Sequence, residues 1–169
     1  MIPLQIESID EKTVRLTGIA PLVADCLQNL DEILAQRDSP EVRQRLFPAP
    51  STDDTINAEW EQYVGPELRH LFVTAAETVL RDLTALEADP QREKYFRVAF
   101  SSSHLDAWMS AINQARLILG EKFHIAEKEM DRHDLDLNRE PDLALIRIHL
   151  LGWLLTVLVE FGSSTATAQ

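Results

Sequence analysis

Residues 141–161 read PDLALIRIHLLGWLLTVLVEF. Proline is favoured in the first turn of a helix and glycine just after its end, so Pro141 and Gly162 predict a helix that ends near Phe161. The uninterrupted apolar part, Leu150–Val159, is about half of the roughly 20 residues that a membrane span needs. We therefore expect a buried core helix and no membrane partner.

A helix that is apolar on nearly every side must be covered on nearly every side. It lies at the centre of a bundle, which we expect, or it forms a homodimer through residues 141–161, which we keep as the alternative. Polar residues on this helix lie along one narrow line, within about 40° of one another at 100° per residue. These residues are Asp142, His149, Thr156 and Glu160.

The composition is that of one globular domain. The chain has 169 residues, 45% of them hydrophobic and five of them glycine, which excludes disordered and low-complexity classes. We expect a single domain over residues 1–162 and a disordered tail over residues 163–169.

Charge restricts the possible partners. The 16 Lys and Arg residues are outnumbered by 28 Asp and Glu residues, which gives a formal charge of −12. Nucleic acids and anionic membranes require clustered basic residues, so we expect direct contact with neither. A single cysteine excludes an internal disulfide, and residues 1–7 lack the features of a secretory signal. We therefore predict a cytoplasmic protein.

Periodicity predicts a mainly α fold with a small antiparallel β-sheet. Alternating apolar residues over 4–16 predict an N-terminal hairpin that ends at Gly18, and residues 94–100 predict a strand that joins it. Helical spacing predicts a bundle of about five helices, in which short helices accompany the long ones. The expected ranges are 21–37, 39–47, 56–64, 66–87, 104–123 and 141–161.

Two pairs of residues have the Glu-x-x-His spacing that di-iron bundles use, Glu67 with His70 and Glu121 with His124. At 100° per residue, neither pair lies on the apolar face of its helix. We therefore predict no di-iron site.

The connector 127–142 is strongly charged, and Asp134, Asp136 and Asn138 begin like a calcium-binding loop. That loop needs glycine at its sixth position and glutamate at its twelfth, where this chain has Arg139 and Leu145. We expect a solvated linker instead.

Residues 101–106 include serines, His104 and Asp106, the residue types of a hydrolase triad. Triad members usually converge from separate segments, whereas Ser103 and Asp106 resemble a helix capping box. Cys26 lies in an apolar helical stripe, with no basic neighbour in its own turn to activate it. The sequence therefore predicts no catalytic residue, no metal and no cofactor.

The most informative polar residue is Arg116, which falls on the apolar stripe of its helix, where an unpaired guanidinium is costly. We hypothesise that Arg116 and Asn113 dock on the polar line of the last helix, beside His149, with Glu160 or Asp142 as the counter-ion. Such a buried polar network would fix the helix register. The alternative is that Arg116 binds a ligand anion.

Residues 113–120 read NQARLILG, an Asn-x-x-Arg-x-x-Leu-Gly segment on a helix that follows a strand. This segment resembles the bacterial family called domain of unknown function 2017. The layout is also similar, with Glu59-Trp60 before a long helix and Trp153 in a Leu-rich terminal helix. The acidic connector 127–142 departs from the family pattern.

The resemblance implies no catalytic residue. In some bacteria, genes of this family lie beside the gene of the Clp-protease adaptor, and some members are labelled transcriptional regulators. The resemblance thus implies a role linked to regulated proteolysis or to regulation. We predict a cytoplasmic, non-enzymatic interaction or regulatory protein with an unknown protein partner, and a small-ligand or metal-binding helical bundle as the alternative.

Overall fold

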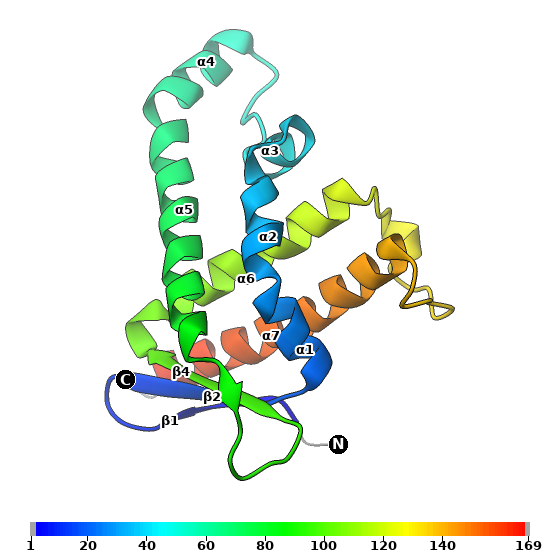
Figure 1. The fold of residues 1–169 in the computed structure, drawn as a ribbon. Coiled ribbons are helices and arrows are strands. Elements are labelled where there is room, and N and C mark those ends of the chain that lie inside the picture. The colour runs from blue at the N-terminus through cyan, green and yellow to red at the C-terminus, as the bar shows by residue number, and fades with distance from the viewer. Residues whose placement is uncertain (1–2, 168–169) are drawn as a thin grey trace.

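A computed structural model describes residues 3–167 (Figure 1). Over these residues, seven α-helices stand against a four-stranded antiparallel sheet, and 65% of the chain is helical. The predicted mainly helical fold class is therefore confirmed. The sheet lies at the base of Figure 1, and the helices rise from it.

The sheet has the strand order β1-β2-β4-β3. The predicted hairpin is formed by β1 (Gln5–Ser8) and β2 (Thr13–Ile19), and the predicted third strand is β4 (Phe96–Ser101). A fourth strand, β3 (Glu87–Ala88), was not expected, because these residues were assigned to the end of a helix. There the chain instead pairs with β4, and the Arg97 Nε donates to the Glu87 Oε1 at 2.8 Å.

Gly18 does not end the hairpin as predicted. Strand β2 continues to Ile19, and its register against β4 shifts between Leu16 and Ile19. Gly18 has φ of 69°, a left-handed conformation that glycine adopts without steric cost and that β-bulges use. The glycine therefore bends the strand rather than terminating it.

The single helix expected over 21–37 is divided into α1 (Pro21–Gln28), α2 (Leu30–Leu34) and a 3₁₀ turn over Ala35–Asp38. The division falls at Asn29, whose side-chain amide donates to the Asp25 carbonyl at 2.8 Å. Asparagine side chains compete in this way with the backbone bonds of a helix. Helix α3 (Pro40–Leu46) follows, as predicted.

Helices α4 (Asp54–Tyr63) and α5 (Gly65–Asp82) meet at the break that Gly65-Pro66 predicted. Asp53 caps α4 by accepting hydrogen bonds from the Thr55 and Ile56 amides. Helix α4 contains no buried residue, and in Figure 1 it projects from the body together with the first turns of α5. We call α4 and residues 65–72 of α5 the arm.

Helices α6 (Leu105–Lys122) and α7 (Glu140–Thr167) lie side by side in the core. Leu105 lies close to Gly162 and Arg116 close to Gly152, so the two helices run antiparallel. The core includes fully buried Leu151, Leu154 and Leu158 of α7. The other side of α7 is partly exposed, so the expected central burial holds for one face of this helix.

By length and composition, α7 could also cross a membrane, a criterion that core helices of soluble proteins meet as well. Of its most apolar window, 39% is buried inside the protein. Its buried leucines pack in the same core as α6 and the sheet, which is the behaviour of a core helix.

The predicted end of α7 near Phe161 is wrong. The helix runs through Gly162 to Thr167, and the residues expected to form a disordered tail are helical up to that point. A Cβ at Gly162 would lie 3.3 Å from the Leu105 Cδ2, so this glycine makes room for α6 instead of ending α7. Residues 1, 2, 168 and 169 of the predicted domain and tail lie outside the described residues.

Trp108 joins the sheet to the helices. Its ring is fully buried and stacks on Phe100 of β4, with ring centroids 4.4 Å apart. Its Nε1 donates to the Asp82 Oδ2 at 2.9 Å, and the same carboxylate lies 2.9 Å from the His104 Nδ1.

The predicted capping box at Ser103 and Asp106 is wrong. Ser102–His104 form a 3₁₀ turn, and α6 begins at Leu105.

We expect Leu151→Ala to lower the free energy of unfolding by about 2–5 kcal/mol, because it leaves a cavity in the α6–α7 core. The control is Val159→Ala on the same helix, where the side chain is 46% exposed. This change should stay within about 0.5 kcal/mol. Urea unfolding followed by circular dichroism measures both, and equal losses would contradict the assigned core.

Candidate functional site

A pocket of about 290 Å³ lies between α6, α3, α7 and the start of the connector. One face of α6 supplies most of its wall, because residues spaced by three or four positions share a helix face. We call it the Arg116 pocket. Its lining residues are Arg45, Asn113, Arg116, Leu117, Gly120, Glu121, Ile125, Met130 and Ile148.

Arg116 lies flat against α7 at Gly152. A Cβ on this glycine would lie 3.4 Å from the Cζ, Nε and Nη2 of the guanidinium. The Nε is buried without a hydrogen-bond partner, and within residues 3–167 Arg116 forms no ion pair. Leaving a buried donor unsatisfied costs about 1–3 kcal/mol. The guanidinium thus lies in a packed position where none of the described residues forms a hydrogen bond with its Nε.

The other charged groups of the pocket partly compensate each other. The Arg45 Nε lies 3.8 Å from the Glu121 Oε1, and both side chains are well exposed, at 58% and 38%. Exposed ion pairs of this kind contribute little to stability. With Arg116 included, the pocket carries two guanidinium groups and one carboxylate, a local excess of positive charge on an acidic protein.

A family model described as Domain of unknown function (DUF2017) matches residues 10–161. The chain belongs to this family. The comparisons with curated proteins and with solved structures give no match.

The segment of this DUF2017 chain that carries the family resemblance is also the segment that forms the pocket. Asn113, Arg116 and Gly120 of the Asn-x-x-Arg-x-x-Leu-Gly pattern all line it, whereas Leu119 is buried in the core. The pattern therefore contains one core residue, Leu119, and three residues on the face of α6 that lines the pocket.

The predicted partners of Arg116 on α7 lie elsewhere. Gly152, where Arg116 rests, is about 15 Å along the helix from Asp142 and about 12 Å from Glu160, at 1.5 Å per residue. These separations exceed the reach of the guanidinium, so the hypothesis that either carboxylate is its counter-ion is wrong. Asn113, His149 and Glu160 are exposed, and His149 lines a separate hollow beside Met130 and Arg132.

Asp142 is buried, as a network residue should be, but it organises the connector instead. Its Oδ1 accepts from the Arg132 Nη1 at 3.2 Å, and its Oδ2 accepts from the Asp136 amide at 3.1 Å. Arg139 lies 3.7 Å away. The Asp136 amide, followed by the two guanidinium groups, holds the pKa of Asp142 below its ordinary value. The expected solvated linker is therefore anchored at one carboxylate.

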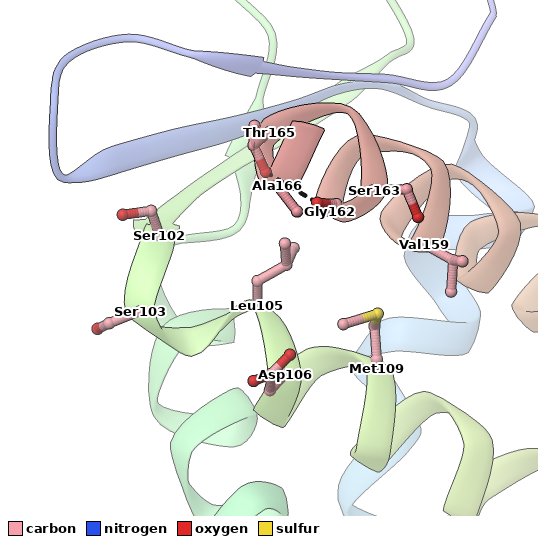
Figure 2. A pocket seen from close by; sticks show the side chains of 10 residues that line it. All are labelled: Ser102, Ser103, Leu105, Asp106, Met109, Val159, Gly162, Ser163, Thr165 and Ala166. Carbon is pink, nitrogen blue, oxygen red and sulfur yellow. Dashed lines mark hydrogen bonds between the residues drawn. The ribbon is translucent and has the colours of Figure 1, made fainter. Parts of the chain in front are cut away.

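A second pocket, of about 450 Å³, lies between the start of α6 and the end of α7 (Figure 2). Among the described residues that line it, Asp106 alone is charged. The hydroxyls of Ser102 and Ser103 point away from the hollow in Figure 2, and His104 is engaged with Asp82 outside it. The residue types of the triad are therefore not assembled around this pocket.

Cys26 is not activated by its surroundings. Burial raises the pKa of its thiol to about 11, although the guanidinium of Arg147 from α7 acts in the opposite direction. The sequence places no basic residue in the same turn as Cys26. The tertiary structure supplies Arg147, whose effect on the pKa is smaller than that of burial. In the described part of the chain, no group of three His, Cys, Asp or Glu side chains is arranged to hold a metal ion.

Two polar residues around α6 were not predicted from the sequence. Arg45 comes from α3, and no local pattern links it to Arg116. Gln114 is buried, and its Nε2 donates to the Phe72 carbonyl at 3.2 Å and to the Ser110 Oγ at 3.1 Å. Its position between Ala111 and Ala115 on the core face of α6 is the feature of the sequence that could have predicted its burial.

We expect Asp142→Asn to lower stability near neutral pH, because it removes the charge that Arg132 and Arg139 face. A carboxylate with a depressed pKa contributes stability above its ordinary value, near 3.8, and loses that contribution as pH falls through the lower pKa of the folded state. The difference between wild type and variant should therefore shrink below about pH 4.

Urea unfolding at a series of pH values measures this difference. The matched control is Asp134→Asn, which removes another carboxylate bound to Arg132 but one that is 86% exposed. This control should have little effect at any pH. A pH-independent loss in Asp142→Asn would contradict the electrostatic role.

Proposed function

We propose that this chain is a cytoplasmic, non-enzymatic interaction or regulatory protein that binds a partner protein through the arm. The observation that carries the proposal is the exposure of large apolar side chains there. Tyr63 is 70% exposed, Leu71 is 58% exposed and Ile56 is 49% exposed. Several large apolar side chains exposed on one projecting segment are the kind of surface that binding sites use.

Helix α4 of the arm is poorly supported by the rest of the protein. Helix α4 packs against α5 and buries none of its own residues. A helix of this length is marginal in water without tertiary packing. A partner that covers the arm would supply the packing that the chain itself does not.

The arm is also acidic. It carries Asp54, Glu59, Glu61 and Glu67, and Arg69 pairs with Glu61 at 3.3 Å. Carboxylates beside exposed apolar side chains match a partner segment that is apolar and basic, such as a basic amphipathic helix. A link to regulated proteolysis, as the family resemblance implies, belongs to this proposal.

The test is comparative capture from the native host. Wild type and the variant Ile56→Gln/Tyr63→Gln/Leu71→Gln are immobilised, and bound proteins are quantified by mass spectrometry. We expect one partner to be depleted by roughly tenfold or more on the arm variant, since a few apolar contacts dominate most interfaces.

The control variant is Ile9→Gln/Leu22→Gln, which changes two exposed apolar residues outside the arm. It should retain the partner. Circular dichroism confirms that all three proteins are folded. If the arm variant captures the same partner as wild type, the arm is not the binding surface.

A specific observation also favours the homodimer through residues 141–161. Ile146, Leu150, Trp153 and Val157 form a stripe along the outer face of α7, each half-buried or exposed, with Trp153 at 38%. Trp153 lies near the middle of the 28-residue helix. Two copies related by a two-fold axis and crossing antiparallel there would bury both stripes.

We expect wild type to show a mass that rises toward twice 19.2 kDa with concentration, and Trp153→Glu to stay monomeric because it places two carboxylates at the axis. Light scattering coupled to size exclusion measures both. Val159→Glu, on another side of α7, is the control and should dimerise like wild type. A monomer at every concentration would exclude this interface.

The alternative of a ligand-binding bundle is supported by the Arg116 pocket, whose unpaired guanidinium is a group that a ligand could satisfy. It does not compete with the arm, because the two surfaces lie on different parts of the chain.

A further inference from the structure

The Arg116 pocket joins an unpaired cation to an apolar wall. Arg116 is the cation, and Leu117, Ile125, Met130 and Ile148 form the apolar part. We propose that this pocket binds a small organic monocarboxylate, a single carboxylate attached to a short chain or one ring. The proposal does not depend on the partner that the arm is proposed to bind.

The polar lining favours a carboxylate. A guanidinium is a planar fork whose donors match the two oxygens of a carboxylate. Asn113 lies one turn before Arg116 on the same wall, and within residues 3–167 its side chain has no hydrogen-bond partner. It adds an amide donor beside the guanidinium.

The charge balance favours a monoanion. Arg45 and Arg116 together outweigh Glu121 by one positive charge. One carboxylate neutralises that excess. A phosphate dianion would exceed it and would also face the carboxylate of Glu121, which costs binding energy at short range.

The apolar lining and the size favour a small ligand. The volume of about 290 Å³ is at the lower end of ligand pockets, which span roughly 300–1,000 Å³. A chain or ring would contact Ile125, Met130 and Ile148, while the carboxylate lies at Arg116. The same chemistry occurs in a free carboxylic acid and in the C-terminus of a peptide with apolar residues.

Isothermal titration tests the proposal with octanoate as the probe and octanamide as its uncharged counterpart. We expect saturable binding of octanoate at one site per chain and no saturable binding of octanamide. A leucine tripeptide with a free C-terminus, compared with its amide, distinguishes the two sources. Tighter binding of octanoate assigns the site to a free acid, and tighter binding of the tripeptide assigns it to a chain end.

Arg116→Gln should weaken octanoate binding by roughly tenfold or more, since it removes a charged hydrogen-bonding partner. Arg43→Gln is the matched control, because Arg43 is an exposed arginine of α3 that does not line the pocket. It should bind octanoate like wild type.

Gly120→Met provides a variant that keeps both arginines. No atom lies within 4 Å of a Cβ built at Gly120, so the new side chain enters open space in the pocket without disturbing the core. We expect Gly120→Met to abolish octanoate binding, and Gly120→Ala to change it little. Thermal unfolding verifies that each variant is folded.

Three results would overturn the proposal. The first is the absence of saturable binding of octanoate and of the tripeptide at millimolar concentration. The second is octanoate binding that persists in folded Arg116→Gln and Gly120→Met. The third is equal binding of octanoate and octanamide, which would show that the carboxylate is not recognised.

Discussion

The structure depends above all on the burial of the apolar surface of α7. This helix is apolar on most of its circumference, and α6, α1 and β1 bury one side of it in the same core as Trp108. Two glycines allow α6 to approach closely, because Leu105 lies against Gly162 and Arg116 lies against Gly152. The remaining elements bury the other sides of α6, and the outer face of α7 stays partly exposed.

This packing explains why a cation lies where no carboxylate within residues 3–167 pairs with it. Arg116 follows the α6 face that meets Gly152, and the acids of α7 lie further along the helix. Asp142, the buried acid, is bound by the Asp136 amide and by Arg132, so it stabilises the connector. The result is a pocket with a local positive charge on a chain whose formal charge is −12.

Much of the fold could be predicted because its signals are local. Alternation predicted the hairpin and β4, and Pro66 predicted the start of α5. The predicted helix bounds were wrong where a contact in the folded protein outweighed the local sequence pattern. Asn29 bonds to the Asp25 carbonyl and divides a helix, while Gly162 serves packing rather than helix termination. A two-residue strand such as β3 has no periodicity of its own and exists through its pairing with β4.

The amino-acid sequence by itself determined the fold class, the resemblance to the DUF2017 family and the unusual position of Arg116 on an apolar helix face. Each of these depends on residue types at fixed spacing along one segment. Only the tertiary structure decided which groups surround Arg116, since Arg45, Met130 and Ile148 come from three other segments. It also decided that α4 has no buried residues, because burial depends on how distant segments pack and not on local spacing.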